Sequence, residues 1–274
     1  MVWLQENMNN IKVSVITVGM NHLKYIKNLY RTLLIEQRPL VNFEAIYVDN
    51  CSTDGSQQWL RKTFPEVRII QNEHVRGFGA NNNIGVKASC GEYIAIINPD
   101  IEILDHAIDR LLSYADKNKD QFGIIAPKLL NPDEEHTVQY SVRHFITLGM
   151  FVNRFLSKGN DDSDNTKVCK YLCKNLDTTK VQQVNWAMGA ALFLTRNFYA
   201  QLDGFDQDYF LYMEDEDICL RSWKIGKPVI YHGEIAVIHN HLRGSSKIGK
   251  KMLRHFQSLF IFFRKHGINV KSYV

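Results

Sequence analysis

The first half of the chain repeats one unit, in which a short apolar, β-branched run ends in polar residues and is followed by apolar residues at helical spacing. Runs typical of buried strands cover five segments, at residues 13–18, 43–48, 67–70, 93–97 and 123–126. Repeated strand–helix–strand units predict an α/β fold with a mostly parallel central sheet and helices on both of its faces.

Polar residues close three of these strands, and we expect them to meet. Asn21 follows the first strand, Asp49-Asn50 the second and Asn98-Pro99-Asp100 the fourth. Because ligands of such sheets bind beyond the carboxyl ends of the strands, the three clusters outline one site. The fixed φ of Pro99 holds the Asp100 carboxylate rigidly, where a hard divalent cation can use it. Taken singly, each cluster is equally compatible with a turn or a helix cap.

The glycine-rich turn at residues 77–85 does not carry the dinucleotide-binding fingerprint. That fingerprint needs a third glycine three residues after the second, and the sequence has Asn82 there. The polar Arg76 and Asn83 beside it favour a turn that faces a ligand over a helix start that only needs close packing.

The acidic run Glu214-Asp215-Glu216-Asp217 lies between two apolar segments, so it is not expected to be a fully solvated face. The positive end of a helix that begins near Glu214 would tolerate the run. Asp217 and Arg221 are then an i,i+4 ion pair, which favours a structural role for Asp217. Glu214 and Asp215 can project into a cleft, and repulsion among neighbouring acids raises pKa values, as suits a general base.

Two histidines, His239 and His241, follow a strand-like run at residues 234–238. A single histidine there is more often held by ordinary hydrogen bonds, but two of them around an asparagine leave a metal or phosphate site equally open. Cys169 and Cys173 have helical spacing without a partner pair, so no zinc site is expected.

Composition and charge exclude other classes of protein. The chain has 33 basic and 29 acidic residues, and the resulting net charge of +4 is too small to indicate a nucleic-acid partner. Five scattered cysteines predict a reduced, cytoplasmic protein rather than a disulfide framework. The sequence shows no secretion signal and no apolar run of about 18 residues that would span a membrane.

The length of 274 residues is compatible with one or two domains. We expect one domain at residues 1–246, with an insert at about 145–180 and a C-terminal tail at 247–274. The tail places apolar residues at helical spacing among lysines and arginines, which predicts a basic amphipathic helix. Such a helix either packs on the core or rests on the inner face of the cell membrane.

Further motifs follow one another in order between about residues 11 and 246. The first half contains Asp49-Asn50-x-Ser52-x-Asp54-Gly55-Ser56, Gly77-Phe78, Asn82-Asn83-x-Gly85 and Asn98-Pro99-Asp100. The second half contains Trp186-x-Met188-Gly189-Ala190, Gly204-Phe205-Asp206 and Phe210-Leu211-Tyr212-x-Glu214-Asp215-x-Asp217. Together they resemble family 2 glycosyltransferases with the GT-A fold, in particular the rhamnosyltransferase-like branch.

The resemblance implies an inverting enzyme that moves a sugar from a nucleotide-diphosphate donor to a cell-surface polysaccharide. The implied donor is dTDP-rhamnose or a UDP-hexose, and the implied acceptor is a glycan or a lipid-linked glycan. In this family the reaction is a metal-assisted direct displacement. Asp215 would be the general base, with Glu214 beside it.

The resemblance also assigns ligand contacts. Asp100 would bind Mg²⁺ or Mn²⁺, with His239 as second ligand in preference to His241. Asp49 would bind a pyrimidine base. Acceptor or sugar contacts would come from Trp186, Met188 and Gly189. The full nucleotide-sugar pocket would comprise Thr17, Asn21, Asp49, Asn50, Arg76, Gly77, Asn83, Asn98 and Asp100.

Two departures from the family pattern keep other functions open. The usual Asp-x-Asp metal motif is reduced to Asn98-Pro99-Asp100, which leaves one carboxylate and allows a non-catalytic, glycosyltransferase-like binding protein. The usual Thr-Tyr before Asn21 is Gly19-Met20 here. A nucleotidyltransferase has a similar sheet, but it normally needs a glycine-rich basic loop after the first strand, and Val18-Gly19-Met20-Asn21 is not one.

Overall fold

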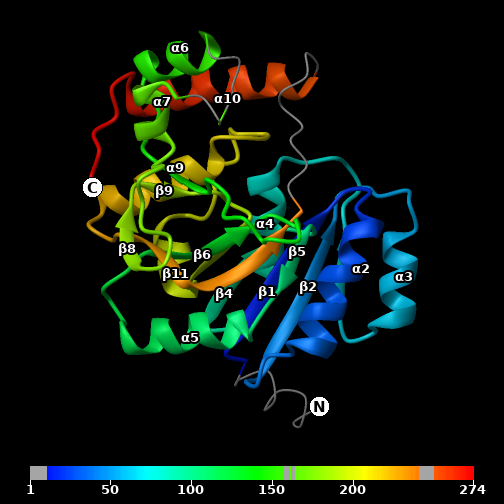
Figure 1. Cartoon of the computed structure of the whole chain (residues 1–274). Coiled ribbons are helices and arrows are strands. Elements are labelled where there is room, and N and C mark those ends of the chain that lie inside the picture. The colour runs from blue at the N-terminus through cyan, green and yellow to red at the C-terminus, as the bar shows by residue number, and fades with distance from the viewer. Residues whose placement is uncertain (1–10, 157–160, 162–163, 241–249) are drawn as a thin grey trace.

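The computed structural model describes all of the chain except residues 1–10, 157–160, 162–163 and 241–249 (Figure 1). Within the described residues a nine-stranded sheet has the order β3-β2-β1-β4-β10-β6-β11-β5, with β8 also paired to β11. The first four strands are parallel, as predicted: β1 (Val13–Gly19), β2 (Phe43–Asp49), β3 (Arg68–Gln71) and β4 (Tyr93–Ile97).

The other half of the sheet is mixed, so the expectation of a mostly parallel sheet holds only for the first half. Strand β10 (Ala191–Thr195) runs antiparallel to both β4 and β6 (Ile124–Leu130). Strand β11 (Val229–His239) is parallel to β6 but antiparallel to β5 (Ile101–Ile103) and β8 (Val181–Val184). The regular strand–helix alternation ends at β6, and a strand that returns after a long excursion need not enter parallel. The three-residue β5 has too short a pattern to be identified from the sequence.

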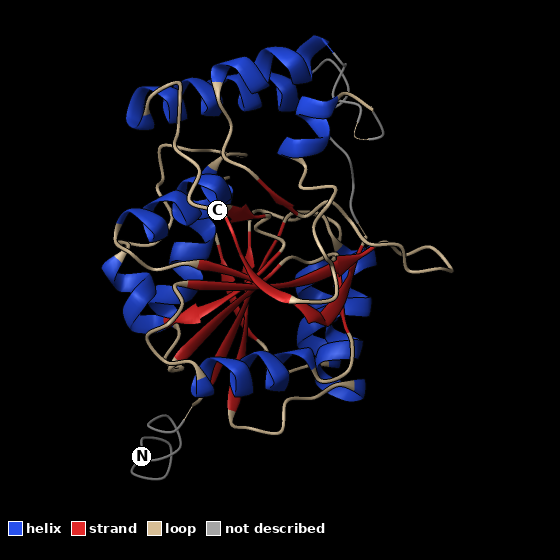
Figure 2. Cartoon of the chain, turned by 60° about the vertical axis from the view of Figure 1, so that its left-hand side comes forward, coloured by secondary structure: helices blue, strands red, loops and turns tan. Residues whose placement is uncertain are grey.

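Helices cover both faces of the sheet (Figure 2). One face packs against α2, α3 and α5, and the other against α4, α8, α9 and α10. Alternate strand residues supply the two cores: Val15 points to the first and Ile16 to the second. The bounds of these helices are α2 (Leu23–Arg31, continued by a π-helical turn Thr32–Glu36), α3 (Ser56–Thr63), α4 (Phe78–Ala88), α5 (Ala107–Lys117), α8 (Arg196–Gln201), α9 (Glu214–Lys224) and α10 (Lys250–His266).

The insert and the tail form one layer above the sheet, at the top of Figure 1. The layer contains α6 (Leu148–Leu156), α7 (Thr166–Tyr171) and α10. Thr147 pairs with Asn269 in an isolated bridge, and the rings of Phe151 and Phe256 meet edge to face at 5.7 Å. Below them, β7 (Val142–Arg143) and β9 (Trp186–Ala187) form a second small sheet.

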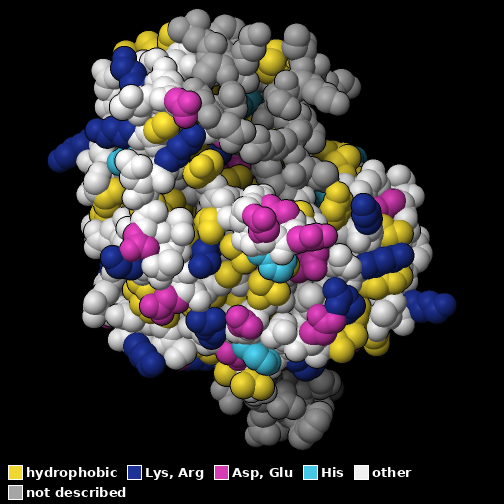
Figure 3. Space-filling view, viewed as in Figure 1, with side chains coloured by type: hydrophobic (Ala, Val, Ile, Leu, Met, Phe, Trp, Pro, Cys, Tyr) yellow, Lys and Arg dark blue, Asp and Glu magenta, His cyan; other side chains and the backbone are white. Residues whose placement is uncertain are grey.

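The tail helix packs on the body of the protein. Leu259 and Phe262 of α10 are buried in the larger hydrophobic core, and His266 donates to the buried Asp217 at 2.7 Å. Of the two alternatives for this helix, packing on the core is thus confirmed for its inner face. None of the described helices is long and apolar enough to cross a membrane. Basic and acidic side chains are interspersed over the face drawn in Figure 3.

Candidate active site

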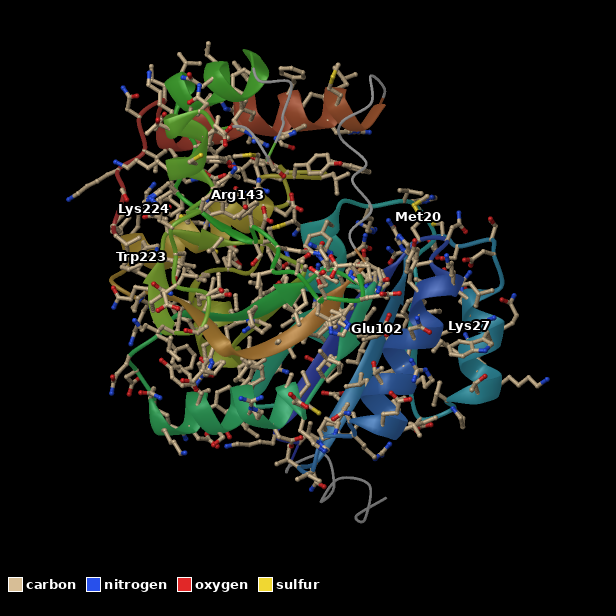
Figure 4. All side chains as sticks on the ribbon, viewed as in Figure 1. Met20, Lys27, Glu102, Arg143, Trp223 and Lys224 are labelled. Atoms are coloured by element: carbon tan, nitrogen blue, oxygen red, sulfur yellow. The ribbon has the colours of Figure 1, made fainter. Side chains whose placement is uncertain are left out.

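The clusters that follow β1, β2, β4 and β11 lie at one edge of the sheet. The register pairs Gly19 with Asp49 at the ends of β1 and β2. The Asn240 N–H, just after β11, donates to the Asp100 carbonyl at 2.8 Å. Because β1 also pairs in parallel with β4, with Ile16 opposite Ile96, the ends of β1, β2 and β4 lie side by side, as predicted. In Figure 4, Met20 and Glu102 lie at this edge.

Asp49 is fully buried among polar side chains beneath the strand ends. One carboxylate oxygen, Oδ2, accepts from the Ser52 N–H at 3.0 Å and from Gln57 Nε2 at 2.8 Å. The other, Oδ1, is buried without a hydrogen-bond partner in the described residues. The Thr17 hydroxyl lies within reach of the Tyr30 hydroxyl. Unsatisfied buried polar atoms are uncommon in proteins and indicate either a missing partner or a functional role.

Tyr47 belongs to the same buried cluster, although its sequence pattern shows only a buried strand residue. Its hydroxyl is buried and lies within reach of the Ser52 and Ser56 hydroxyls. A Cβ atom on Gly19 would come within 2.1 Å of that hydroxyl. Gly19, one of the two departures from the family pattern, therefore leaves the space that the Tyr47 ring occupies.

Several predicted nucleotide contacts hold loops together instead. Asn50 accepts from the Arg76 N–H at 2.9 Å and donates to the Arg76 carbonyl at 3.0 Å, so it fixes the backbone of that turn. Asn21 accepts from the Thr53 N–H at 2.8 Å, which joins the loops after β1 and β2. The amide oxygens of Asn50 and Asn21 both accept from backbone N–H groups, so these side chains fix the loops at the strand ends.

Asn83 corrects the prediction from the glycine-rich turn. Its amide donates to the Phe205 carbonyl at 2.8 Å and accepts from the Phe205 N–H at 2.9 Å. The hydroxyl of Tyr199 also donates to the Asn83 carbonyl oxygen. This side chain thus ties α4 to a segment 122 residues further on, and its carbonyl oxygen is fully used there.

Gly77 joins the two halves of the site. A Cβ atom at this position would lie 2.6 Å from the Phe210 carbonyl oxygen, and the Phe78 N–H donates to that same oxygen at 2.9 Å. Only glycine permits the turn to come this close to the motif that leads into α9.

Asp100 and His239 form a carboxylate–imidazole pair at the strand-end edge. Asp100 Oδ2 lies 3.7 Å from His239 Nε2, and both side chains are largely buried. Burial raises the pKa of Asp100 to about 6. Asn98 is held by its backbone N–H, which donates to the Ala190 carbonyl at 2.8 Å. His241 lies outside the described residues.

Gln139, which sequence reasoning missed, orients the His239 ring. The Gln139 amide nitrogen donates to the His239 carbonyl at 2.8 Å and to Asn131 Oδ1 at 2.9 Å. Its oxygen therefore faces His239 Nδ1, 2.8 Å away, and assigns the proton to that nitrogen. Nε2 then presents its lone pair toward Asp100, which is the tautomer that metal-ligating histidines use.

The acidic run starts α9, as predicted, and its members separate into different roles. Asp217 is buried between Arg221 Nε and His266 Nε2, each at 2.7 Å, which confirms the predicted i,i+4 pair. Glu216 is buried and accepts from the Ile146 N–H at 2.5 Å. These two acids hold α9 to its surroundings.

Asp215 is the accessible member of the run. Its Oδ2 accepts from the Gly189 N–H and its Oδ1 from the Glu216 N–H, both at 3.0 Å. Burial raises its pKa, and these two N–H donors offset part of the rise. Glu214 is more deeply buried, and burial together with the Asp215 charge raises its pKa well above the usual range. Of the two carboxyl groups, Glu214 is therefore the one that holds a proton more strongly.

The acceptor-side motif is tied to Asp215 through its backbone. Gly189 donates to Asp215, and the Met188 N–H donates to the Ser141 carbonyl at 2.9 Å. Trp186 is buried, and its indole N–H donates to the His144 carbonyl at 2.9 Å. Because the Trp186 side chain is only 5% exposed, its ring packs inside the protein and is not free to stack on a sugar. This corrects the role predicted for Trp186.

Comparison with known proteins shows how far this arrangement is shared. The Glycosyl transferase family 2 model matches residues 14–177. The Escherichia coli K12 protein "Rhamnosyltransferase WbbL" is 30% identical over 265 residues, covering 93% of this chain and 94% of the relative. The Mycobacterium tuberculosis "N-acetylglucosaminyl-diphospho-decaprenol L-rhamnosyltransferase" is 27% identical, covering 84% of this chain and 76% of the relative.

Solved structures agree in fold at lower sequence identity. Staphylococcus aureus TarS with UDP-GlcNAc has a TM-score of 0.58 at 16% identity, over 85% of this chain and 60% of that one. The Pyrobaculum calidifontis mannosyltransferase PcManGT, solved with GDP-Man and Mn²⁺, has a TM-score of 0.61 at 17% identity, over 97% of this chain and 67% of that one. The fold is thus GT-A, and the chain belongs to glycosyl transferase family 2, as a hexosyltransferase of the rhamnosyltransferase-like branch.

Proposed function

We propose that this protein transfers a sugar, with inversion, from a nucleotide-diphosphate donor to a glycan of a cell-surface polysaccharide. The observation that supports this proposal most directly is a backbone link between the predicted metal ligand, Asp100, and the predicted base, Asp215. The backbone N–H of Asn98, two residues before Asp100, donates to the Ala190 carbonyl. The N–H of Gly189, the residue before Ala190, donates to the Asp215 carboxylate. The predicted metal ligand and the predicted base are thereby fixed to one short segment of backbone.

Asp215 is the general base in this proposal. It accepts the proton of an acceptor hydroxyl as that oxygen forms a bond to the anomeric carbon. The bond from this carbon to the leaving diphosphate breaks on the opposite face, and the nucleoside diphosphate departs with the electron pair. A positioned base of this kind contributes about 10²- to 10⁴-fold to the rate.

Asp100 and His239 are the residues that would hold Mg²⁺ or Mn²⁺. The ion would supply a positive charge that stabilises the leaving diphosphate. The donor set fits it in kind, since it offers one carboxylate oxygen and one imidazole lone pair oriented by Gln139. Within the described residues no group of three or more His, Cys, Asp or Glu could hold a metal. Donor phosphate oxygens and water would complete the shell.

The unpartnered oxygen of Asp49 supports recognition of the donor's pyrimidine base. Asp49 Oδ1 is without a hydrogen-bond partner among the described residues, and a pyrimidine ring supplies an N–H donor for such an oxygen. We propose dTDP-rhamnose as the donor, because the two curated relatives described above are rhamnosyltransferases by name. A UDP-hexose is the alternative, and TarS was solved with UDP-GlcNAc.

The outer face of α10 supports contact with a lipid surface, which a lipid-linked acceptor would require. Leu253, Phe256 and Phe260 follow at i, i+3 and i+7 and are 60%, 39% and 70% exposed. Leu253 and Phe260 lie across the helix from the buried Phe262, whereas Phe256 borders the buried face and meets Phe151 of α6. Neither α6, α7 nor α10 contains an acidic residue, so an anionic bilayer is the surface this layer fits.

Flotation with phosphatidylglycerol vesicles tests the lipid contact. Phe260→Glu should lose most of the binding, whereas Gln257→Glu, a matched charge change beside the stripe, should retain most of it. Equal loss in both variants, or no flotation of the wild type, would refute this use of α10. A dimer in light scattering that Phe260→Glu dissolves would show that a second copy covers the stripe.

The donor is tested by thermal shift with dTDP-, UDP- and GDP-sugars, each with and without Mn²⁺. The true donor should raise the melting temperature most, since stabilisation grows with ligand concentration relative to Kd. Sugar transfer to a lipid-linked acceptor is then measured through the amount of nucleotide released. Binding without transfer would identify a non-catalytic protein, and a new phosphoanhydride product would identify a nucleotidyltransferase.

A further inference from the structure

Two consecutive residues in the left-handed backbone region lead directly into α9. Tyr212 and Met213 both have a φ of 70°, a conformation that residues with a bulky side chain seldom adopt. Strained backbone of this kind persists only where the surrounding structure holds it, and it gathers at functional sites. The Met213 carbonyl accepts the first hydrogen bond of α9, from the Asp217 N–H at 2.8 Å. The direction in which Asp215 leaves the backbone therefore depends on this turn.

The donor half of the protein anchors the segment just before the turn. The Phe210 carbonyl accepts from the Phe78 N–H at 2.9 Å, next to the close approach of Gly77. Asn81 holds that glycine turn from its own helix, because its amide donates to the Arg76 carbonyl at 3.1 Å and to the Gly77 carbonyl at 2.9 Å. One end of the segment is thus fixed at Phe210.

The inner face of α10 packs on the same segment from the other side, and Figure 1 shows this helix above α9. Ser258 Oγ donates to the Leu211 carbonyl at 2.8 Å, and this serine is only 2% exposed. The His255 ring, about one turn earlier on α10, lies 5.0 Å from the ring of Tyr212. The tail helix therefore contacts the segment where the left-handed backbone begins.

Ser258 does not strengthen the helix that carries it. It is the only residue of α10 with a hydroxyl group, and at an interior helix position alanine is the better helix former. A serine inside a helix commonly bonds to the carbonyl four residues earlier or points to solvent. This one donates to a carbonyl 47 residues away. A residue that departs from local preference in this way is expected where function requires it.

We infer that Ser258 is a positioning residue for the general base, because its bond to the Leu211 carbonyl holds the left-handed turn that aims Asp215. The inference rests on the proposed function, in which Asp215 takes the proton of the acceptor hydroxyl, and it adds a residue of the tail helix to that step. With the turn in place, Asp215 Oδ2 meets the Gly189 N–H at 3.0 Å. When the turn relaxes, α9 begins differently and Asp215 moves away from this donor.

Ser258→Ala tests the assignment, because it removes only the hydroxyl and keeps a residue that favours the helix. The kcat for sugar transfer should fall about 3- to 10-fold, the factor that corresponds to one hydrogen bond. The Kd of the nucleotide-sugar should stay within about twofold, since the Arg76 turn keeps its bonds to Asn50 and Asn81. An unchanged kcat would overturn the inference.

Ile261→Val is the matched control on the same helix. It removes one methyl group from a half-buried residue of α10, which costs about as much stability as one hydrogen bond. The hydrocarbon side chain donates no hydrogen bond to the turn, so the kcat of this variant should equal that of the wild type. If Ile261→Val is slowed as much as Ser258→Ala, Ser258 serves only to dock α10, and the inference is wrong.

The pH dependence of kcat is a readout that docking of α10 alone does not move. Burial raises the pKa of Asp215, and the Gly189 N–H offsets part of that rise. Ser258→Ala weakens this bond, so the pKa of the base increases and the acid limb of the kcat profile should move to higher pH. The acid limb of Ile261→Val should stay in place. A slower Ser258→Ala whose acid limb does not move would contradict the assignment.

Hydrogen exchange measured by mass spectrometry separates the inference from the proposed function, because it requires no reaction. In Ser258→Ala, peptides that cover residues 209–217 should exchange at least about threefold faster, while those from 80–88 of α4 should match the wild type. Faster exchange in 209–217, with no sugar transfer by the wild type, would refute the proposed function and leave Ser258 as the residue that holds the turn. Unchanged exchange in 209–217 would overturn the inference even if sugar transfer is observed.

Discussion

Replacing Asp215 by asparagine tests whether this residue, rather than another acid of α9, is the general base. Both carboxylate oxygens accept backbone N–H groups, from Gly189 and Glu216. An asparagine has only one acceptor oxygen, so one N–H loses its partner, at a cost of about 1–3 kcal/mol. The variant should remain folded, with a melting temperature lower by a few degrees.

The catalytic loss should be much larger than this change in stability suggests. Without a carboxylate to take the proton, kcat should fall about 10²- to 10⁴-fold, while the Kd of the nucleotide-sugar stays within about twofold, since Asp215 belongs to the acceptor side. The assay measures nucleotide release under saturating donor and acceptor, and calorimetry measures donor binding.

Asp217→Asn is the matched control on the same helix. It breaks a buried ion pair with Arg221 and His266, so it should lower stability by about 3–5 kcal/mol. At a temperature where it is folded, its kcat should remain close to that of the wild type. If Asp215→Asn transfers sugar as fast as the wild type, or if Asp217→Asn is the slower variant, the base has been assigned to the wrong residue.

Three further predictions concern the residues that build the site. Gln139→Ala should raise the Mn²⁺ concentration needed for half-maximal activity about 10- to 100-fold, since it orients His239; an unchanged Mn²⁺ titration would count against the metal site. Gly77→Ala should destabilise by about 1–3 kcal/mol, because its Cβ meets the Phe210 backbone, whereas Gly149→Ala, with open space around it, should be neutral or stabilising; similar melting temperatures would contradict this. Glu216 has a raised pKa through burial, so the folded state holds its proton more tightly and stability falls as pH rises above the unfolded pKa near 4.5. Glu216→Gln should flatten that fall in urea titrations between pH 5 and pH 8, and a slope equal to that of the wild type would refute it.

The sequence alone was sufficient for the elements whose pattern is local. Strand β4 has the predicted bounds, and the acidic run begins a helix with the Asp217–Arg221 pair in place. The parallel half of the sheet also followed, because strand–helix alternation allows few other topologies. The convergence of Asp49 and Asp100 needed only the rule that parallel strands end at one edge.

Tertiary structure decided which polar side chains are left for a ligand. Asn83 is occupied by Phe205 and His239 is oriented by Gln139, across 122 and 100 residues. No local pattern carries such pairings, because hydrogen-bond partners distant in sequence are set only by packing. The same is true of the antiparallel β10 and of the tail helix on the core.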